Sequence, residues 1–271
     1  MPLTSFQKSV LAILAPARSP DSYLAGGTAL HLAPESVRYS RDFDFFHDLE
    51  AKVAETYSGD RELLEQGDYQ VDVLISQPGH IRATVGKDAE TTQIDWARDS
   101  AWRFLPIVKV DLGGFVLHEV DLATNKLLAL AGRDEARDFV DILYVMDRIL
   151  PLGPLIWAAV AKDPGYSPHS LLEQVRKRGK YRSEELDRLD LVAPLDLQAA
   201  KQTWIAALSQ AEAFVDSRPP NEAGCLYYSF ELDRFVEPRP DLSLDEQGIA
   251  LHFGRPGGVL PRPTEQSIVP D

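Results

Sequence analysis

Residues 23–46 read Y-L-A-G-G-T-A-L-H-L-A-P-E-S-V-R-Y-S-R-D-F-D-F-F, and the prediction of the fold starts from this stretch. The apolar residues 23–25 predict a short strand. Gly26 and Gly27 predict a turn at its end, because glycine adopts backbone conformations that other residues avoid. The segment after the turn predicts a short helix capped by Thr28.

The second half of the stretch carries two carboxylates, Asp42 and Asp44, in a run of aromatic residues. In a strand, successive side chains point to opposite faces, so both carboxylates would share one face while Phe43 and Phe45 enter the core. Neighbouring carboxylates repel each other, and burying them unpaired is costly. Divalent cations remove that cost, and Asp oxygens suit Mg²⁺, so the pattern predicts two Mg²⁺ ions at this face.

A second block lies at residues 121–141. D-L-A-T-N-K-L-L-A-L predicts a helix in which Lys126 has mostly apolar neighbours, and such a lysine needs an anionic partner or a route to solvent. The next predicted helix, residues 134–150, carries acids at i, i+4 and i+7, which would share one face. These acids are Asp134, Asp138 and Asp141, and Arg133 and Arg137 can pair with them in a structural salt-bridge network.

Together, G-G-T-A-L, R-x-S-x-D-x-D-F-F, A-x-N-K-L-x-A-L and R-D-x-x-D resemble the AbiEii/AbiGii toxin family of nucleotidyltransferases, within the polymerase-beta-type superfamily. The resemblance implies an α/β (α+β) fold, with a small mixed sheet followed by a helical C-terminal domain. It implies metal-dependent transfer of a nucleotide from an NTP to an acceptor, with release of pyrophosphate. In the family the acceptor can be the 3′ end of tRNA, and the enzyme is the toxin of a pair with a cognate antitoxin.

Chemistry of the polymerase type needs a third carboxylate on a neighbouring strand. Asp95 lies in a predicted strand at residues 91–96, and Asp72 lies in an equally plausible strand at residues 69–76. The resembling family places this acid after the intervening hairpin, which favours Asp95 and keeps Asp72 as the alternative.

The resemblance also implies a nucleotide site. Lys126 would hold the triphosphate, and either Asp138 or Asp141 would be required for activity. The predicted nucleotide-binding residues are Gly26, Gly27, Thr28, Ser40, Arg41, Lys126 and Arg137. Two other functions stay open: transfer to a small molecule such as an antibiotic, and a nucleotide-binding protein that has lost catalysis on the same scaffold.

The run at residues 176–182, R-K-R-G-K-Y-R, holds five basic residues. It has two interpretations. The charges can complement the dipole of the helix that the run ends, or they can contact the backbone of an RNA acceptor while Tyr181 stacks on a base.

The composition sets further limits. The net charge of −14 argues against nonspecific coating of nucleic acid. The single cysteine, Cys225, suits a reducing cytoplasm, and no apolar run is long enough to span a membrane. The sequence P-L-G-P at residues 151–154 predicts a domain boundary, giving a catalytic domain at 1–150, a helical domain at 151–216 and a proline-rich segment at 217–271. Ser58-Gly59-Asp60 predicts a break between helices at residues 49–57 and 61–66.

Overall fold

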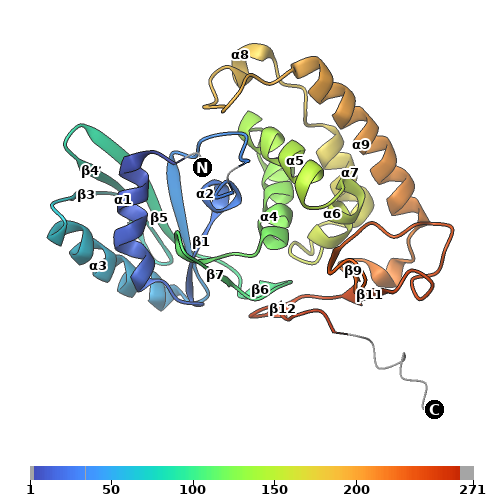
Figure 1. The fold of residues 1–271 in the computed structure, drawn as a ribbon, viewed down its shortest axis with the longest axis horizontal. Coiled ribbons are helices and arrows are strands. Elements are labelled where there is room, and N and C mark those ends of the chain that lie inside the picture. Colours follow the sequence, from blue (N-terminus) through green and yellow to red (C-terminus); the bar gives the residue numbers. More distant parts are fainter. Residues whose placement is uncertain (1–2, 34, 263–271) are drawn as a thin grey trace. The chain divides into compact units, whose positions relative to one another are not determined.

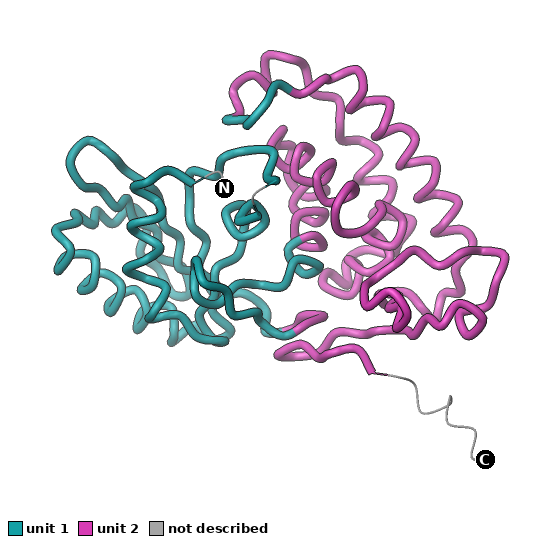
Figure 2. The backbone as a smooth tube through the Cα atoms, viewed as in Figure 1, with its two compact units in different colours: residues 1–101, 106–122, 190–194 teal, residues 102–105, 123–189, 195–271 magenta. Residues whose placement is uncertain are grey.

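The computed structural model describes residues 3–33 and 35–262. The chain divides into two compact units (Figure 2): unit 1 comprises residues 1–101, 106–122 and 190–194, and unit 2 comprises residues 102–105, 123–189 and 195–271. The predicted domain boundaries at residues 150 and 216 stay predictions. In the part of the chain that the structure describes, no helix is long and apolar enough to cross a membrane.

Unit 1 is built on a mixed seven-stranded sheet with the strand order β3-β4-β5-β2-β1-β8-β7. At its centre β2 pairs in parallel with β5 and antiparallel with β1. The mixed sheet confirms the predicted fold class. The strands are β1 (Ser22–Ala25), β2 (Asp42–His47), β3 (Gln70–Gln77), β4 (His80–Lys87), β5 (Glu90–Arg98), β7 (Val108–Val110) and β8 (Gly114–Val116).

One face of this sheet is the core of unit 1. Phe43 and Phe45 of β2 lie beside Ile94 and Trp96 of β5, and all four side chains are fully buried. The helices α1 (Ser5–Leu14) and α3 (Glu50–Gln66) lie along the sheet (Figure 1). The 3₁₀ turn Ala15–Ala17 follows α1, and the short helix α2 (Gly26–Leu30) follows β1.

The predicted break at Ser58-Gly59-Asp60 is wrong, because α3 is continuous through these residues. The Asp60 side chain is buried and forms an ion pair with Arg18, and it accepts a hydrogen bond of 2.7 Å from the indole nitrogen of Trp96. These tertiary contacts override the low helix propensity of Gly59.

Unit 2 is mainly helical. The helix α6 is buried along its whole length and packs against α9, where the rings of Trp157 and Phe214 meet edge to face. The helix α4 (Glu119–Gly132) begins in unit 1 and ends in unit 2. The other helices are α5 (Ala136–Arg148), α6 (Leu152–Ala159), α7 (Pro168–Arg176), α8 (Ser183–Leu186), α9 (Leu197–Ser217) and the 3₁₀ turn Pro220–Glu222.

Two small sheets complete unit 2. The first has the order β10-β9-β11 and joins β9 (Leu226–Ser229), β10 (Arg234–Phe235) and β11 (Ile249–His252). The second pairs β6 (Trp102–Arg103) with β12 (Arg255–Pro256). Of the predicted C-terminal segment, residues 263–271 lie outside the described part.

Candidate active site

The two aspartates of β2 lie on the sheet face opposite the aromatic core. Asp42 and Asp44 are half-buried, whereas Phe43 and Phe45 are fully buried, as the alternating pattern predicts. Asp44 is directly opposite Asp95 on the neighbouring strand β5. We call the face that carries Asp42, Asp44 and Asp95 the carboxylate face.

The register separates the two candidates for the third carboxylate. Asp95 is adjacent to Asp44, but Asp72 pairs with Thr84 of β4, which pairs with Gln93 of β5 and so lies three strands from β2. At about 4.8 Å per strand, Asp72 is roughly 14 Å from Asp42. The placement therefore supports Asp95 as the third member of the set.

The backbone conformation and the nearby Asp44 side chain both require glycine at position 26. Its φ is +64°, and a Cβ atom built on it would lie 1.7 Å from Oδ2 of Asp44. A side chain there would displace the carboxylate. The predicted cap at Thr28 is wrong, since α2 begins at Gly26 and the buried Thr28 hydroxyl donates to the carbonyl oxygen of Asp42 instead.

Ser40 is held from two directions. Its hydroxyl donates to Oδ1 of Asp42 at 2.9 Å, and its carbonyl oxygen accepts from Nε2 of Gln7 at 2.7 Å. Gln7 also completes the capping box of α1 with Thr4. The bond from Gln7 to Ser40 joins residues 33 positions apart, so no local sequence pattern predicts it. A Cβ on Gly27 would lie 3.0 Å from the Ser40 hydroxyl, so Gly27 gives the serine its space.

The loop before β2 is tied to residues 190–194. Tyr39 N donates to Asp190 O at 2.8 Å, and the Arg41 side chain forms an ion pair with Asp190. A cavity of about 520 Å³ opens beside this loop, between the start of α1 and the start of β5, and Tyr39, Ser40 and Arg41 line it.

Asp95 has basic partners that the sequence does not predict. Its Oδ1 lies 2.8 Å from Nε of Arg82 and 2.6 Å from Nε2 of His80, and its Oδ2 accepts from Gln93 at 3.2 Å. The hydrogen bond to Asp95 raises the pKa of the Arg82 guanidinium, and the charges of Asp44 and Asp42 act in the same direction. The alternating pattern of β4 shows that Arg82 faces away from the core, but it does not show that Arg82 is opposite Asp95.

The carboxylate face offers suitable ligands for Mg²⁺ but not a preassembled cage. Within residues 3–33 and 35–262, no three Asp, Glu, His or Cys side chains are already arranged to hold a metal ion. Oxygen ligands on adjacent strands, with Gly26 leaving room at Asp44, fit Mg²⁺. At Asp95 the metal site is not preassembled, because Oδ1 of this carboxylate contacts Arg82 and His80.

Unit 2 holds the second predicted cluster. Nζ of Lys126 on α4 lies 2.9 Å from Oδ2 of Asp141 and 3.6 Å from Oδ1 of Asp138, and Arg133 makes two hydrogen bonds to Asp138. Both aspartates are completely buried, and the lysine side chain is 9% exposed, which excludes a solvent-exposed lysine. We call Lys126, Arg133, Asp138 and Asp141 the lysine network.

One prediction about the neighbouring residues is wrong. Asp134 does not share a helix face with Asp138, because α5 begins only at Ala136. It accepts a hydrogen bond from the hydroxyl of Tyr181 instead. Arg137 lies 2.6 Å from Glu135, and its predicted pairing with Asp134 or Asp141 stays a prediction.

The basic run at residues 176–182 is not a continuous free surface. Tyr181 is buried and its ring packs against Phe139, so the predicted stacking on a base is wrong. Arg178 donates to the carbonyl oxygens of Leu130 and Ala131 at the end of α4. This contact caps the C-terminus of α4 and not that of α7, the helix that the basic run ends, so the interpretation in which the charges complement their own helix stays a prediction.

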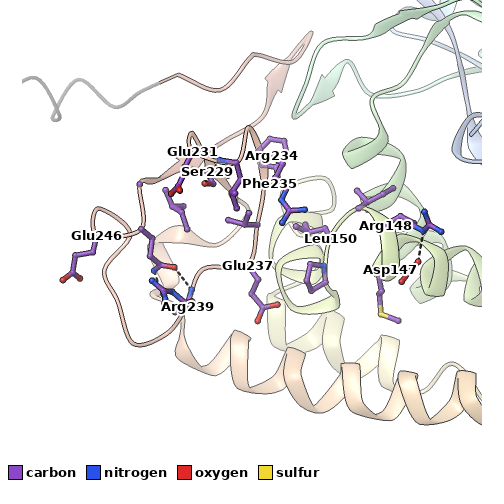
Figure 3. Close-up of a pocket in the computed structure, with 18 residues that line it drawn as sticks. Asp147, Arg148, Leu150, Ser229, Glu231, Arg234, Phe235, Glu237, Arg239 and Glu246 are labelled. Carbon is purple, nitrogen blue, oxygen red and sulfur yellow. Dashed lines mark hydrogen bonds and ion pairs between the residues drawn. The ribbon is translucent and has the colours of Figure 1, made fainter.

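Unit 2 also contains a cavity of about 680 Å³ between the end of α5 and the three-stranded sheet (Figure 3). Arg148, Arg234 and Arg239 line it together with Glu231 and Glu237. None of the predicted site residues lines this cavity, so it is separate from both clusters.

Residues 10–217 match the family described as "Nucleotidyl transferase AbiEii toxin, Type IV TA system". An uncharacterized protein of Aquifex aeolicus (strain VF5) is 33% identical over 133 residues, which are 46% of this chain and 58% of that relative. The chain therefore spans little more than half the length of this curated relative.

Among solved structures, the chain is similar to MenT4, a nucleotidyltransferase toxin from Mycobacterium tuberculosis H37Rv. The TM-score is 0.52 at 20% identity, and the alignment covers 80% of this chain and 83% of MenT4. At that identity the similarity establishes the fold, which is that of a nucleotidyltransferase.

Proposed function

The chain belongs to the AbiEii family of nucleotidyltransferase toxins, and from this we propose that it transfers a nucleotide from an NTP to an acceptor in a Mg²⁺-dependent reaction. The observation that carries the proposal is the carboxylate face, where Asp42, Asp44 and Asp95 come from two adjacent strands. We propose the 3′ end of tRNA as the acceptor and a cognate antitoxin as the protein partner, in line with the family.

In the proposed reaction an acceptor oxygen attacks the α-phosphorus of the NTP. The new O–P bond forms while the bond from that phosphorus to the bridging oxygen breaks, and pyrophosphate leaves with the electron pair. Mg²⁺ held by Asp42, Asp44 and Asp95 would supply charge stabilisation for the transferred nucleotidyl group. The acceptor proton passes to a carboxylate of the face, for which Asp95 is the candidate.

The other residues take supporting parts in this proposal. Ser40, which donates to Asp42, keeps that carboxylate oriented. The cavity beside Ser40 and Arg41 is where we expect the nucleoside. Lys126 is the proposed ligand of the triphosphate, and Asp141, at 2.9 Å, the acid that orients it.

The test is incubation with each radiolabelled NTP and total RNA, followed by gel analysis. We expect label in RNA of tRNA size, in the presence of Mg²⁺ and not of EDTA. Asp42→Asn should abolish the transfer while the melting temperature stays that of the wild type. Asp21→Asn, outside the site, is the control. Full activity in Asp42→Asn would rule out the proposed role of the carboxylate face.

The same assay separates the alternatives. Label on a small molecule but not on RNA would indicate a nucleotidyltransferase of the antibiotic-modifying kind. NTP binding without any transfer would indicate a scaffold that has lost catalysis. Melting curves recorded with Mg²⁺ and each NTP detect binding independently of turnover, because a ligand of the folded state raises its stability.

A further inference from the structure

Asp95 is covered by basic side chains that solvent can reach. Its own side chain is 7% exposed, whereas Arg82 is 37% and His80 is 28% exposed. Both basic groups point to the same oxygen, Oδ1. A carboxylate oxygen has two lone pairs, so these two donors saturate Oδ1.

The three strands align the charges in one row. Asp44 of β2 is directly opposite Asp95 of β5, which is directly opposite Arg82 of β4. Like charges on directly opposed residues destabilise a sheet, and opposite charges stabilise it. Arg82 therefore offsets the repulsion between the two aspartates, which is the task that the proposed function gives to Mg²⁺.

Arg82 and a metal ion cannot both use Oδ1 of Asp95 in this arrangement. Mg²⁺ binds its oxygen ligands at about 2.0–2.1 Å and accepts little departure from octahedral geometry. A cation at Oδ1 must displace at least one of the two donors. When Arg82 is the donor that is displaced, its guanidinium stays beside the site, since its strand is fixed and its side chain is long and partly exposed.

We propose that Arg82 is a phosphate-binding residue of the active site that serves as the counter-cation of Asp95 until Mg²⁺ binds there. The inference rests on the proposed function. A guanidinium binds two phosphate oxygens in a planar fork, so the released Arg82 would hold the triphosphate of the substrate.

The proposal gives two effects of opposite sign. Arg82→Ala should bind Mg²⁺ alone several-fold more tightly, because the competing cation is gone. In saturating Mg²⁺ the same variant should bind inorganic triphosphate about 10- to 100-fold more weakly, because a charge-assisted hydrogen bond is lost. Arg82→Lys keeps the charge but not the fork, so it should show near-wild-type Mg²⁺ affinity and weakened triphosphate binding.

Calorimetric titration of the full chain with MgCl₂, and then with inorganic triphosphate in MgCl₂, measures both affinities without turnover. Arg61→Ala is the matched control, since Arg61 pairs with Glu65 at 2.7 Å on the outside of α3. Melting curves verify folding, and Arg82→Lys decides the outcome if Arg82→Ala does not fold. Unchanged triphosphate affinity in the folded Arg82 variants would overturn the inference.

The result can be separated from failure of the proposed function. If Asp95→Asn weakens Mg²⁺ binding while Arg82→Ala changes neither affinity, the metal site stands and the inference about Arg82 is wrong. If Asp42→Asn and Asp95→Asn leave both Mg²⁺ binding and nucleotide transfer intact, the proposed function itself is wrong, and the inference that rests on it falls as well.

Discussion

The carboxylate face of unit 1 and the lysine network of unit 2 are built from the same kinds of residue but differ in exposure. Asp42 and Asp44 are half-buried, and Arg82 is partly exposed. Asp138 and Asp141 are completely buried. Charges that water reaches can exchange partners at low cost, whereas buried charges depend on the partners they have. The first cluster is therefore suited to binding a cation, and the second to holding α4 and α5 together.

The largest effect expected from this difference is at Lys126. Lys126→Met should lower the free energy of unfolding by about 3–5 kcal/mol, because the completely buried Asp141 would lose its ion pair with the lysine. Methionine keeps the helix, since it is a comparable helix former. Urea unfolding measures the change. Lys52→Met is the control, since Lys52 forms an exposed pair with Glu55, and its effect should stay within about 0.5 kcal/mol.

The same variant tests the proposed role of Lys126 toward the triphosphate. If Lys126→Met unfolds like the wild type but binds Mg²⁺–NTP roughly 10- to 100-fold more weakly, the lysine is a ligand and the network is not what stabilises unit 2. That result would contradict the conclusion that the lysine network serves stability and the carboxylate face serves binding.

A smaller effect on stability is expected at Gly26, whose backbone lies against Asp44 of the carboxylate face. Gly26→Ala should cost about 1–3 kcal/mol of stability, because alanine is strained at positive φ and its Cβ would clash with Asp44. Mg²⁺ binding should weaken in parallel. Gly59→Ala is the opposite control: nothing lies within 4 Å of a Cβ there, and the residue is inside α3, so stability should rise by about 0.5–1 kcal/mol.

The two clusters also differ in how much of them the sequence predicts. The shared face of Asp42 and Asp44 follows from the period of a strand, which is a local property. The need of Lys126 for an anionic partner follows from its apolar neighbours. The partners themselves come from distant pairing: Asp95 meets Arg82 only through the register of β4 and β5, which no local pattern fixes.

Buried polar contacts explain the remaining errors. Asp60 was assigned to a break because Ser-Gly-Asp is poor in helix propensity, but its partner Arg18 lies 42 residues earlier in the chain. Tyr181 stands in a basic run, which allows the interpretation that it stacks on a base of RNA, but the structure buries it beside Asp134 and Phe139. In both cases tertiary contacts outweigh the local pattern.

The core face of β2 carries a histidine, His47, whose burial should make the stability of the protein depend on pH. His47 is fully buried, and burial lowers the pKa of its imidazole from 6.5 to about 4. Between these values the unfolded chain binds a proton that the native state excludes. Stability should therefore fall with decreasing pH in this window, on the order of 1 kcal/mol per pH unit. Urea unfolding across the window should show a shallower slope for His47→Gln; equal slopes would show that other groups cause the loss.

The smallest change in stability is expected when an aspartate of the carboxylate face is replaced by asparagine. The same kind of replacement in the lysine network should have a much larger effect. Asp44→Asn removes one of two opposed carboxylates, so stability should be unchanged or higher by up to about 0.5 kcal/mol, while nucleotide transfer is lost. Asp141→Asn removes the charge opposite a buried lysine, so it should cost several times more, on the order of 3 kcal/mol. Urea unfolding of the two variants at neutral pH compares them directly. A loss above about 2 kcal/mol in Asp44→Asn would mean that Asp44 also carries the fold, because only a carboxylate engaged in the native structure loses that much on neutralisation.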